Sequence, residues 1–252
     1  MEIGRFIYKD EIFYGIITGG DKVTVLEGEP YGQIMPGSQV YTIDQLKTLA
    51  PCTPTKAVCV GLNYRDHAEE VGYPIPEEPI LFIKPSTTVI GPGADITYPP
   101  SSIQVDYEAE LAVVIGRTCR NVAIEQAREY ILGYTCGNDV TARDLQRKDG
   151  QWTRAKSFDT FLPLGPYIIT ELDPGNLSVE LRLNGETKQS SSTANLIFDV
   201  FTLVSFISGV MTLKPGDVIM TGTPGGIGPI AVGDKIEVEI QGIGVLSNGA
   251  SR

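Results

Sequence analysis

Acidic residues alternate along the stretch QVDYEAELAVVIG, residues 104–116. In a β-strand, alternate side chains point to the same face, so Asp106, Glu108 and Glu110 would emerge together. Neighbouring carboxylates would lie about 6–7 Å apart, where repulsion costs about 2–3 kcal/mol per pair at an intermediate dielectric. A basic partner or a bound hard cation such as Mg²⁺, Mn²⁺ or Ca²⁺ would relieve this repulsion. The alternative is a solvated strand start whose apolar part begins at Leu111.

Two later segments carry residues suited to the same chemistry. Asp139 follows an apolar strand pattern in GYTCGNDVTARDLQ, residues 133–146. It could supply another carboxylate, or simply cap the short helix predicted after it, with Thr141 and Asp144 as a capping pair. Lys156 lies between a tryptophan and a phenylalanine in WTRAKSFDTF. It could meet the acids, or lay its stem along apolar surface.

The glycine-rich stretch MTGTPGGIG, residues 220–228, could act through its backbone. It lacks the Gly-Lys-Ser/Thr of a nucleotide-binding P-loop. Its N–H groups could instead hold a carboxylate, and Thr221 and Thr223 add hydroxyl groups.

His67 is the single histidine of the chain, and it lies three residues before Glu70 in VGLNYRDHAEEVG. On a helix the two would be neighbours, and the carboxylate would hold the imidazole in one tautomer and raise its basicity. The alternative is an exposed helix pair without a role. One histidine per chain excludes a zinc site built from several imidazoles. The proline-rich stretch 73–82 is predicted to be a loop that covers a site.

The elements that must position these residues follow from turn signals and apolar spacing. Residues 1–50 are predicted to form short strands, with a helical piece at 42–50 that Thr42 caps. Prolines then bracket the following segment and mark a domain boundary. This gives a small β-rich N-terminal domain at 1–52 and a larger domain at 53–252.

The larger domain is predicted to be strand-rich, which makes the fold α+β and mainly β. One short helix begins near Asn63, and a second covers 122–132, with Asn121 as cap and Gly133 as stop. The apolar run 196–213 is long enough to test for a membrane span, but its helical spacing fits a core helix better.

Composition narrows the class of protein. The chain has 252 residues and a net charge of −11, which argues against nucleic acid and anionic membrane surfaces as partners. Its four cysteines show no metal-ligand spacing and are expected to be reduced and mostly buried. The N-terminus lacks the apolar core of a signal peptide, so we expect a cytoplasmic protein.

Taken together, these segments resemble the fumarylacetoacetate hydrolase family. The motifs come in the family's order across roughly residues 55–230: GLNYRDHAEE, PILFIKPST, VDYEAELAVVIG, GYTCGNDVTARDLQ, WTRAKSFDTFLPLGP and MTLKPGDVIMTGTPGGIG. Each motif alone is a weak signal, and six in one order are specific. The resemblance implies a β-roll-like catalytic domain with a few helices, a small appended N-terminal domain and a homodimer.

The resemblance also implies roles for individual residues. The carboxylate ligands of a divalent ion, Mg²⁺ or Mn²⁺, would be Glu108, Glu110 and Asp139. Asp106 matches a position that is not a ligand. His67 and Glu70 match a water-activating dyad. The positions that face substrate are matched by Lys156, which we expect to act catalytically, and by Arg143, Gln146 and Thr223, which we expect to bind substrate.

Three protein carboxylates leave about half of an octahedral shell open, which a 2-oxo acid can fill through its carboxylate and 2-oxygen. The metal would stabilise the enolate formed when a bond β to the carbonyl breaks, and Lys156 would add positive charge. We therefore predict an enzyme that acts on short 2-oxo or enol acids, of acylpyruvate or oxaloacetate type, by C–C hydrolysis or decarboxylation.

Two alternatives stay open. One is a 2-hydroxyhepta-2,4-diene-1,7-dioate isomerase/decarboxylase of aromatic catabolism, because motifs do not separate the members. The other is a non-catalytic, cation-stabilised binding module with its Ca²⁺ shell closed by protein. Lys156 and the His67–Glu70 pair speak against this module, since a structural ion needs neither.

Overall fold

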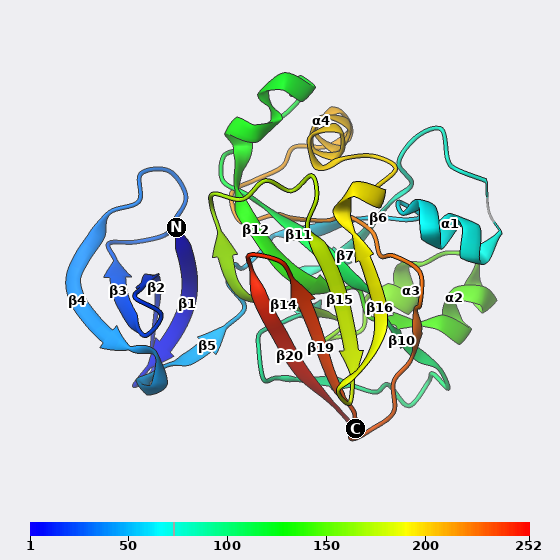
Figure 1. Cartoon of the computed structure of the whole chain (residues 1–252), viewed down its shortest axis with the longest axis horizontal. Helices are drawn as coiled ribbons and strands as arrows, with labels where there is room; N and C mark the ends of the chain where they lie inside the picture. The colour runs from blue at the N-terminus through cyan, green and yellow to red at the C-terminus, as the bar shows by residue number, and fades with distance from the viewer. Residues whose placement is uncertain (73) are drawn as a thin grey trace.

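The computed structural model describes residues 1–72 and 74–252, and strands make up most of its regular structure (Figure 1). The mainly β, α+β fold predicted from the sequence is thereby confirmed. The α-helices are α1 (Arg65–Val71), α2 (Arg143–Asp149), α3 (Thr153–Lys156) and α4 (Val200–Val210). The 3₁₀ helices are η1 (Ile43–Gln45), η2 (Ser86–Thr88), η3 (Ile124–Tyr130) and η4 (Thr193–Asn195).

The largest sheet has 12 strands and runs through the whole molecule. Its order is β4 (Pro36–Thr42), β3 (Lys22–Leu26), β2 (Glu11–Thr18), β1 (Glu2–Tyr8), β14 (Leu162–Ile169), β12 (Ile131–Asn138), β11 (Ala109–Ile115), β17 (Val218–Met220), β6 (Lys56–Val60) and β7 (Leu81–Pro85). β5 (Lys47–Leu49) pairs with β1, and β8 (Val89–Ile90) pairs with β14.

The N-terminal strands form the lobe at the left of Figure 1, and β5 leads from it towards the rest of the chain. The lobe is joined to the larger part by antiparallel pairing of β1 with β14, where Glu2 lies opposite Ile169 and Ile3 opposite Ile168. The two predicted domains, 1–52 and 53–252, therefore share one sheet, and the division between them stays a prediction.

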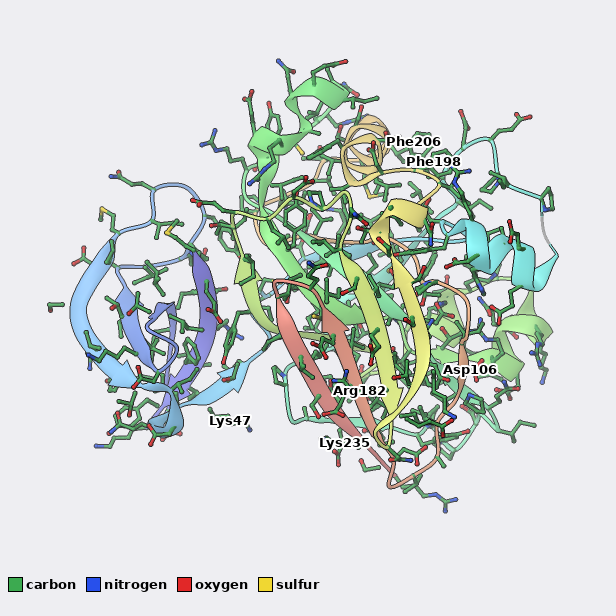
Figure 2. All side chains as sticks on the ribbon, viewed as in Figure 1. Lys47, Asp106, Arg182, Phe198, Phe206 and Lys235 are labelled. Carbon is green, nitrogen blue, oxygen red and sulfur yellow. The ribbon has the colours of Figure 1, made fainter. Side chains whose placement is uncertain are left out.

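Two smaller sheets complete the fold. The first contains β16 (Glu186–Ser192), β15 (Ser178–Leu183), β19 (Lys235–Ile240), β20 (Gly244–Ser251) and β9 (Asp95–Thr97), and the second contains β13 (Thr141–Ala142), β10 (Val105–Tyr107) and β18 (Gly228–Pro229). One face of the five-stranded sheet is apolar. On its other face Arg182, labelled in Figure 2, forms ion pairs with Glu180 and Glu239.

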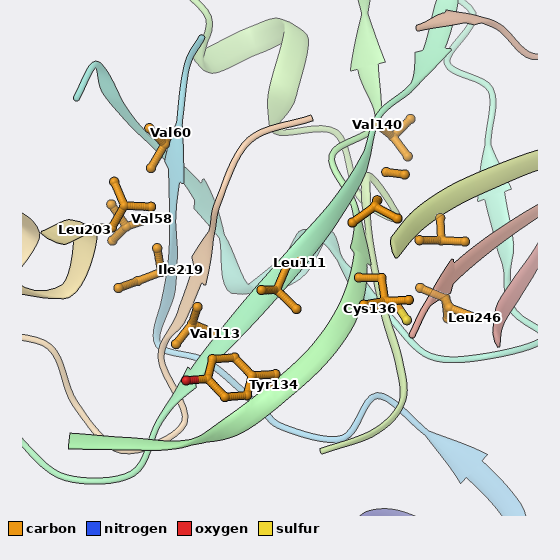
Figure 3. Packing of buried hydrophobic residues seen from close by; sticks show 14 of the residues in the cluster. Val58, Val60, Leu111, Val113, Tyr134, Cys136, Val140, Leu203, Ile219 and Leu246 are labelled. Atoms are coloured by element: carbon orange, nitrogen blue, oxygen red, sulfur yellow. The ribbon is translucent and has the colours of Figure 1, made fainter. Parts of the chain in front are cut away.

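Strand β11 is buried on both faces, as its sequence predicted. Leu111 and Val113 belong to the core shared with β12 and the five-stranded sheet, together with Tyr134 (Figure 3). Ala112 and Val114 belong to a second core on the other face. A strand fixed on both faces is a rigid support for the acids at its start.

The helices differ in part from prediction. α1 follows the expected course and ends at Gly72, which has a left-handed backbone. The helical piece expected at 42–50 is only the turn η1. Thr42 does form a capping box there, but the chain then extends to pair β5 with β1. At this point cross-strand pairing outweighs local helix propensity.

The helix predicted at 122–132 is wrong in type, because the structure has the 3₁₀ helix η3. Asn121 has a φ of 54° and is not the cap, and Gly133 lies inside β12 opposite Val114. The run 196–213 contributes the core helix α4, which begins after Asp199. Among the described residues, no helix has both the length and the apolar character needed to cross a membrane.

Residues 74–80 between α1 and β7 contain no helix or strand, in agreement with the predicted loop, but the last two residues of that prediction, 81 and 82, belong to β7. Residue 73, the first of that predicted loop, lies outside the described residues. That this loop covers a site stays a prediction.

Candidate metal centre and active site

The acids of the stretch 104–116 do not share one strand, so that prediction is wrong. The chain breaks at Glu108, which separates β10 in the three-stranded sheet from β11 in the large sheet. At the break the Glu108 N–H donates to Asn138 Oδ1 at 2.9 Å, and the Asp139 N–H donates to the Glu108 carbonyl at 2.9 Å. This irregular pairing at the ends of β11 and β12 brings Glu108 and Asp139 side by side.

Glu108, Glu110 and Asp139 form a buried carboxylate cluster. One oxygen from each lies within 4.8 Å of the others, and the exposed fractions are 6%, 1% and 1%. Asp139 is therefore not a helix cap. α2 begins at Arg143 instead, and no side chain caps it. The solvated strand start considered for this segment is also wrong.

Three basic side chains from separate segments contact the cluster, namely Lys84, Arg143 and Lys156. Lys156 Nζ donates to Glu108 Oε2 at 2.9 Å and to Asp139 Oδ2 at 2.7 Å. Lys84 Nζ donates to Asp139 Oδ1, and to the Val140 carbonyl at 3.0 Å. Lys156 is 2% exposed and Lys84 is 0% exposed, so neither lysine lies along the surface with its charge in water.

Asp106 is excluded from the cluster by Arg143. The Arg143 Nε donates to Asp106 Oδ2 at 2.7 Å, while its Nη2 donates to Glu108 Oε1 at 2.5 Å. The third nitrogen, Nη1, donates to Gln146 Oε1 at 2.6 Å. Arg143 thus holds Asp106, Glu108 and Gln146 in one arrangement, and its own nitrogens are all engaged with protein.

Charge is unevenly balanced across the cluster. Burial would raise the pKa of Glu108, but Lys156 and Arg143 outweigh it and hold this pKa below its ordinary value. Burial raises the pKa of Glu110 well above its ordinary value, and Asp139 and Glu108 raise it further. Glu110 forms no ion pair with a described residue, and its Oε2 accepts only the Gly222 N–H, at 2.7 Å.

The residues fit a hard divalent cation. Four carboxylates, those of Asp106 and the cluster, face three basic side chains, which leaves one uncompensated negative charge (four minus three). Every cluster donor is a carboxylate oxygen, the ligand that Mg²⁺ and Mn²⁺ prefer. The positive charge missing at Glu110 is what such an ion would provide.

The glycine-rich loop 221–226 holds two protein carboxylates through its backbone. Besides the bond from Gly222 to Glu110, the Gly226 N–H donates to Glu70 Oε2 at 3.1 Å. The loop thereby links the acidic cluster to α1. Thr221 Oγ1 donates to the Leu111 carbonyl at 2.9 Å, which ties the loop to β11.

His67 and Glu70 lie together on α1, as their spacing predicted. His67 Nδ1 is 3.1 Å from Glu70 Oε2. The helix is anchored at its start, where Asp66 Oδ2 accepts from Ser191 Oγ and Asp66 Oδ1 accepts from the His67 N–H. Glu70 therefore has two fixed partners, the imidazole and the loop.

Two buried residues at the site were not identified from the sequence. Lys84 interrupts the apolar strand β7, and a lysine between apolar residues was the available signal. Gln189, 1% exposed, donates to Thr223 Oγ1 at 2.9 Å and accepts from the Ala109 N–H at 2.9 Å. Gln189 is buried although most of β16 is exposed, and no pattern in the sequence predicted this.

The fold and the site together describe a mainly β protein with a buried carboxylate cluster surrounded by basic side chains. Residues 56–250 match the fumarylacetoacetate (FAA) hydrolase C-terminal family, and residues 1–51 match the Rv2993c-like, N-terminal family. The chain belongs to the fumarylacetoacetate hydrolase family, whose named members are isomerases, hydrolases and tautomerases.

Three similar proteins show the range of activities. The structure of 5-carboxymethyl-2-hydroxymuconate delta-isomerase from Mycobacterium smegmatis is 44% identical, with a TM-score of 0.95 and full coverage of both chains. Human mitochondrial oxaloacetate tautomerase FAHD2B is 45% identical over 79% of this chain and 68% of its own. Fumarylpyruvate hydrolase from Pseudomonas aeruginosa, solved with Mn²⁺ and pyruvate, is 34% identical, with a TM-score of 0.75, covering 81% of this chain and 91% of that one.

Proposed function

We propose that this protein is a divalent-metal-dependent enzyme that stabilises the enolate of a short 2-oxo acid. The first reaction we propose is C–C hydrolysis or decarboxylation of an acylpyruvate or of oxaloacetate. The observation that carries the proposal is the carboxylate cluster with Lys156 bridging two of its members and Glu110 left without a positive partner.

Mg²⁺ or Mn²⁺ held by Glu108, Glu110 and Asp139 would supply Lewis-acid stabilisation of an enolate oxygen. Lys156 would add a fixed ammonium beside that oxygen, and it stays protonated because Asp139 and Glu108 hold its pKa above the ordinary value against the effect of burial. A preorganised charge in a buried site needs no reorganisation during the reaction.

Gln146 and Thr223 would bind the substrate. Gln146 accepts from Arg143 through its oxygen, so its amide NH₂ is available as a donor. Thr223 accepts from Gln189 through its hydroxyl oxygen, so its own proton is available to an anionic group. We propose that Arg143 contributes by holding Gln146 and Glu108 in place.

His67 would transfer the proton. Its Nδ1 faces Glu70, which leaves Nε2 to take a proton from water as the water attacks the distal carbonyl of an acylpyruvate. The C–C bond then breaks to give a carboxylic acid and the enolate of pyruvate, which takes up a proton. In decarboxylation the same enolate forms as CO₂ leaves.

Tautomerisation or isomerisation is the second candidate. It is favoured by the relatives named oxaloacetate tautomerase and by the isomerase structure that matches the whole chain. Each candidate passes through the enolate of a 2-oxo acid, which is that of pyruvate after cleavage and that of the intact substrate in tautomerisation, so they differ in whether a bond between carbons breaks. The homodimer and the cytoplasmic location remain predictions.

A substrate panel with product analysis tests the proposal. Acetylpyruvate, fumarylpyruvate, oxaloacetate and a 2-hydroxy-dienedioate would each be incubated with metal-free protein, then with Mg²⁺ or Mn²⁺. Metal-dependent release of pyruvate supports cleavage. Keto–enol exchange without pyruvate or CO₂ supports the tautomerase instead. No turnover of any of these acids with either metal would reject both.

Replacing His67 separates proton transfer from binding. We expect His67→Asn to lower kcat for cleavage by about 10²–10⁴-fold, the usual contribution of a general base. Thermal stability should stay unchanged, because Glu70 keeps its bond to Gly226. Arg65→Ala, at an exposed position of the same helix, is the matched control. Equal kcat values for His67→Asn and wild type would remove His67 from the mechanism.

A further inference from the structure

A cavity lies where the N-terminal strands meet the rest of the chain. It has a volume of about 260 Å³. Its polar lining residues are Arg5, Cys52, Thr53 and Ser86, and the other residues that line it are glycine and apolar residues. The lining residues come from β1, from the end of β5 and the segment after it, and from η2, β8 and the residue after β8. Cavities between structural units are common places for small ligands.

Arg5 is an arginine without a partner. Of the arginines in the described residues, only Arg5, Arg143 and Arg182 are partly buried. The last two form ion pairs with acids, whereas Arg5 forms no hydrogen bond or ion pair with any described residue. A guanidinium removed from water normally has a carboxylate or phosphate partner, because its planar donors are matched to those groups.

The other polar groups of the cavity are also free to donate. The Ser86 side chain forms no hydrogen bond with described residues, the Thr53 hydroxyl lies close to that of Tyr14, and both residues are exposed enough to turn towards a ligand. No acidic residue lines this cavity. Burial raises the pKa of the Cys52 thiol to about 12, so the thiol adds no negative charge.

Arg5 and Thr53 also line a neighbouring cavity of about 380 Å³. That cavity contains Glu29, which would repel an anion. Tyr14 lines it as well, and the buried Tyr14 hydroxyl has no hydrogen-bond partner among described residues. The balance of charge therefore favours the first cavity as the place where an anion meets Arg5.

We propose that Arg5, Thr53 and Ser86 form a binding site for a small oxyanion, a carboxylate or a phosphate, separate from the acidic cluster. The guanidinium would bind two oxygens of the anion, and the two hydroxyls would donate to the remaining oxygens of a phosphate or to the second lone pairs of a carboxylate.

Isothermal titration of the full-length, metal-free protein tests this site. The probes are inorganic phosphate and succinate, titrated separately at low ionic strength in EDTA. We expect one of them to bind wild type saturably, and Arg5→Met to weaken that binding at least about tenfold. Ser86→Ala should weaken it by a smaller factor. Arg117→Met, at an exposed arginine outside the cavity, should leave it unchanged.

The two probes distinguish which kind of anion the site binds. Binding of phosphate alone would indicate a phosphate site, and binding of succinate alone would indicate a carboxylate site. Binding that is equal in wild type, Arg5→Met and Ser86→Ala would belong to another part of the protein and would overturn the proposal. Absence of binding of both probes would overturn it as well. Thermal unfolding of each variant checks that the fold is kept, and Ser86→Ala removes a side chain without hydrogen bonds to described residues.

Discussion

Glu110 is the residue whose surroundings most clearly call for a cation. It is as buried as Asp139, yet Asp139 has two lysines and Glu110 has one backbone N–H. A buried carboxylate without a positive partner destabilises the folded protein. The other two acids of the cluster are stabilised by basic residues with or without a metal, so Glu110 is the member whose charge depends on one.

We expect Glu110→Gln to lower the affinity for metal without lowering the stability of the metal-free protein. The metal-free variant should be at least as stable as wild type, because it lacks a buried carboxyl group that has no positive partner. Its affinity for Mn²⁺ should fall by more than about a hundredfold, which exceeds the usual effect of losing an outer-shell partner. Calorimetric titration and thermal unfolding in EDTA measure the two effects. Glu69→Gln, exposed on α1, is the control. Unchanged Mn²⁺ affinity would remove Glu110 from the ligand set.

At the scale of elements, the site depends on a loop rather than on a helix or strand. The loop 221–226 follows β17 and binds Glu110 at one end and Glu70 at the other. Gly226 has a φ of 89°, and a Cβ there would lie 2.3 Å from the Lys188 carbonyl. Glycine is required at this position both by the backbone conformation and by the close approach of β16.

Gly226→Ala tests the loop, and Gly233→Ala is its matched control. Gly233 has a similar φ of 96°, but nothing lies within 4 Å of a Cβ there. Both variants should lose about 1–2 kcal/mol of stability to backbone strain. Only Gly226→Ala should also lose activity, by at least about tenfold, because the clash displaces the N–H that holds Glu70. Equal activity in the two variants would show that the loop does not position the dyad.

The junction of β6 and β17 depends on Asp217, which is 0% exposed. Its carboxylate accepts from the Thr55 N–H at 3.0 Å, from Thr55 Oγ1 at 2.7 Å and from the Lys214 N–H at 2.9 Å, and it pairs with Lys56. Burial would raise the pKa of Asp217, but the hydrogen bonds from Lys56, Thr55 and Lys214 outweigh it and lower this pKa below the ordinary value.

The pKa of Asp217 is lower in the folded state than in the unfolded state. Its ionised carboxylate therefore adds to the free energy of unfolding above the ordinary aspartate pKa range, and this gain is lost as the pH falls through the pKa of the folded state. We expect Asp217→Asn to cost about 2–4 kcal/mol at pH 7, since it leaves Lys56 without its charge partner. The difference in free energy of unfolding between this variant and wild type should shrink below about pH 4. Chemical denaturation across pH measures it, with the exposed Asp159→Asn as control. A difference that is constant with pH would contradict the expectation.

At the scale of the whole molecule, one sheet of 12 strands carries both the N-terminal strands and the acidic cluster. The helices α1, α2 and α3 gather at the side of the molecule opposite the N-terminal lobe (Figure 1). The proposed oxyanion site lies where the lobe meets the rest of the chain.

The oligomeric state is a prediction at this scale. We expect a homodimer, with a mass in solution of twice the 27.2 kDa of one chain. Light scattering coupled to size-exclusion chromatography at several protein concentrations measures it. A single species with the mass of one chain at every concentration would contradict the expectation. Including metal-free and Mn²⁺-containing samples shows whether the metal changes the association.

The sequence by itself determined the features that depend on neighbours along the chain. The burial of β11 on both faces follows from its apolar residues, and the His67–Glu70 contact follows from helical spacing. All four cysteines are free and buried, as their spacing indicated. These features depend on local geometry, with periods of 2 and 3.6 residues, which a pattern of residue types records directly.

Only the tertiary structure decided how the charges are paired. Lys84, Lys156 and Arg143 reach the acids from separate segments, and Gln189 reaches Thr223 from a strand whose sequence is polar. The break at Glu108 depends on Asn138, 30 positions along the chain. Electrostatic and hydrogen-bond energies depend on distance in space, and residue spacing fixes that distance only within one element. The packing of the sheets sets it everywhere else.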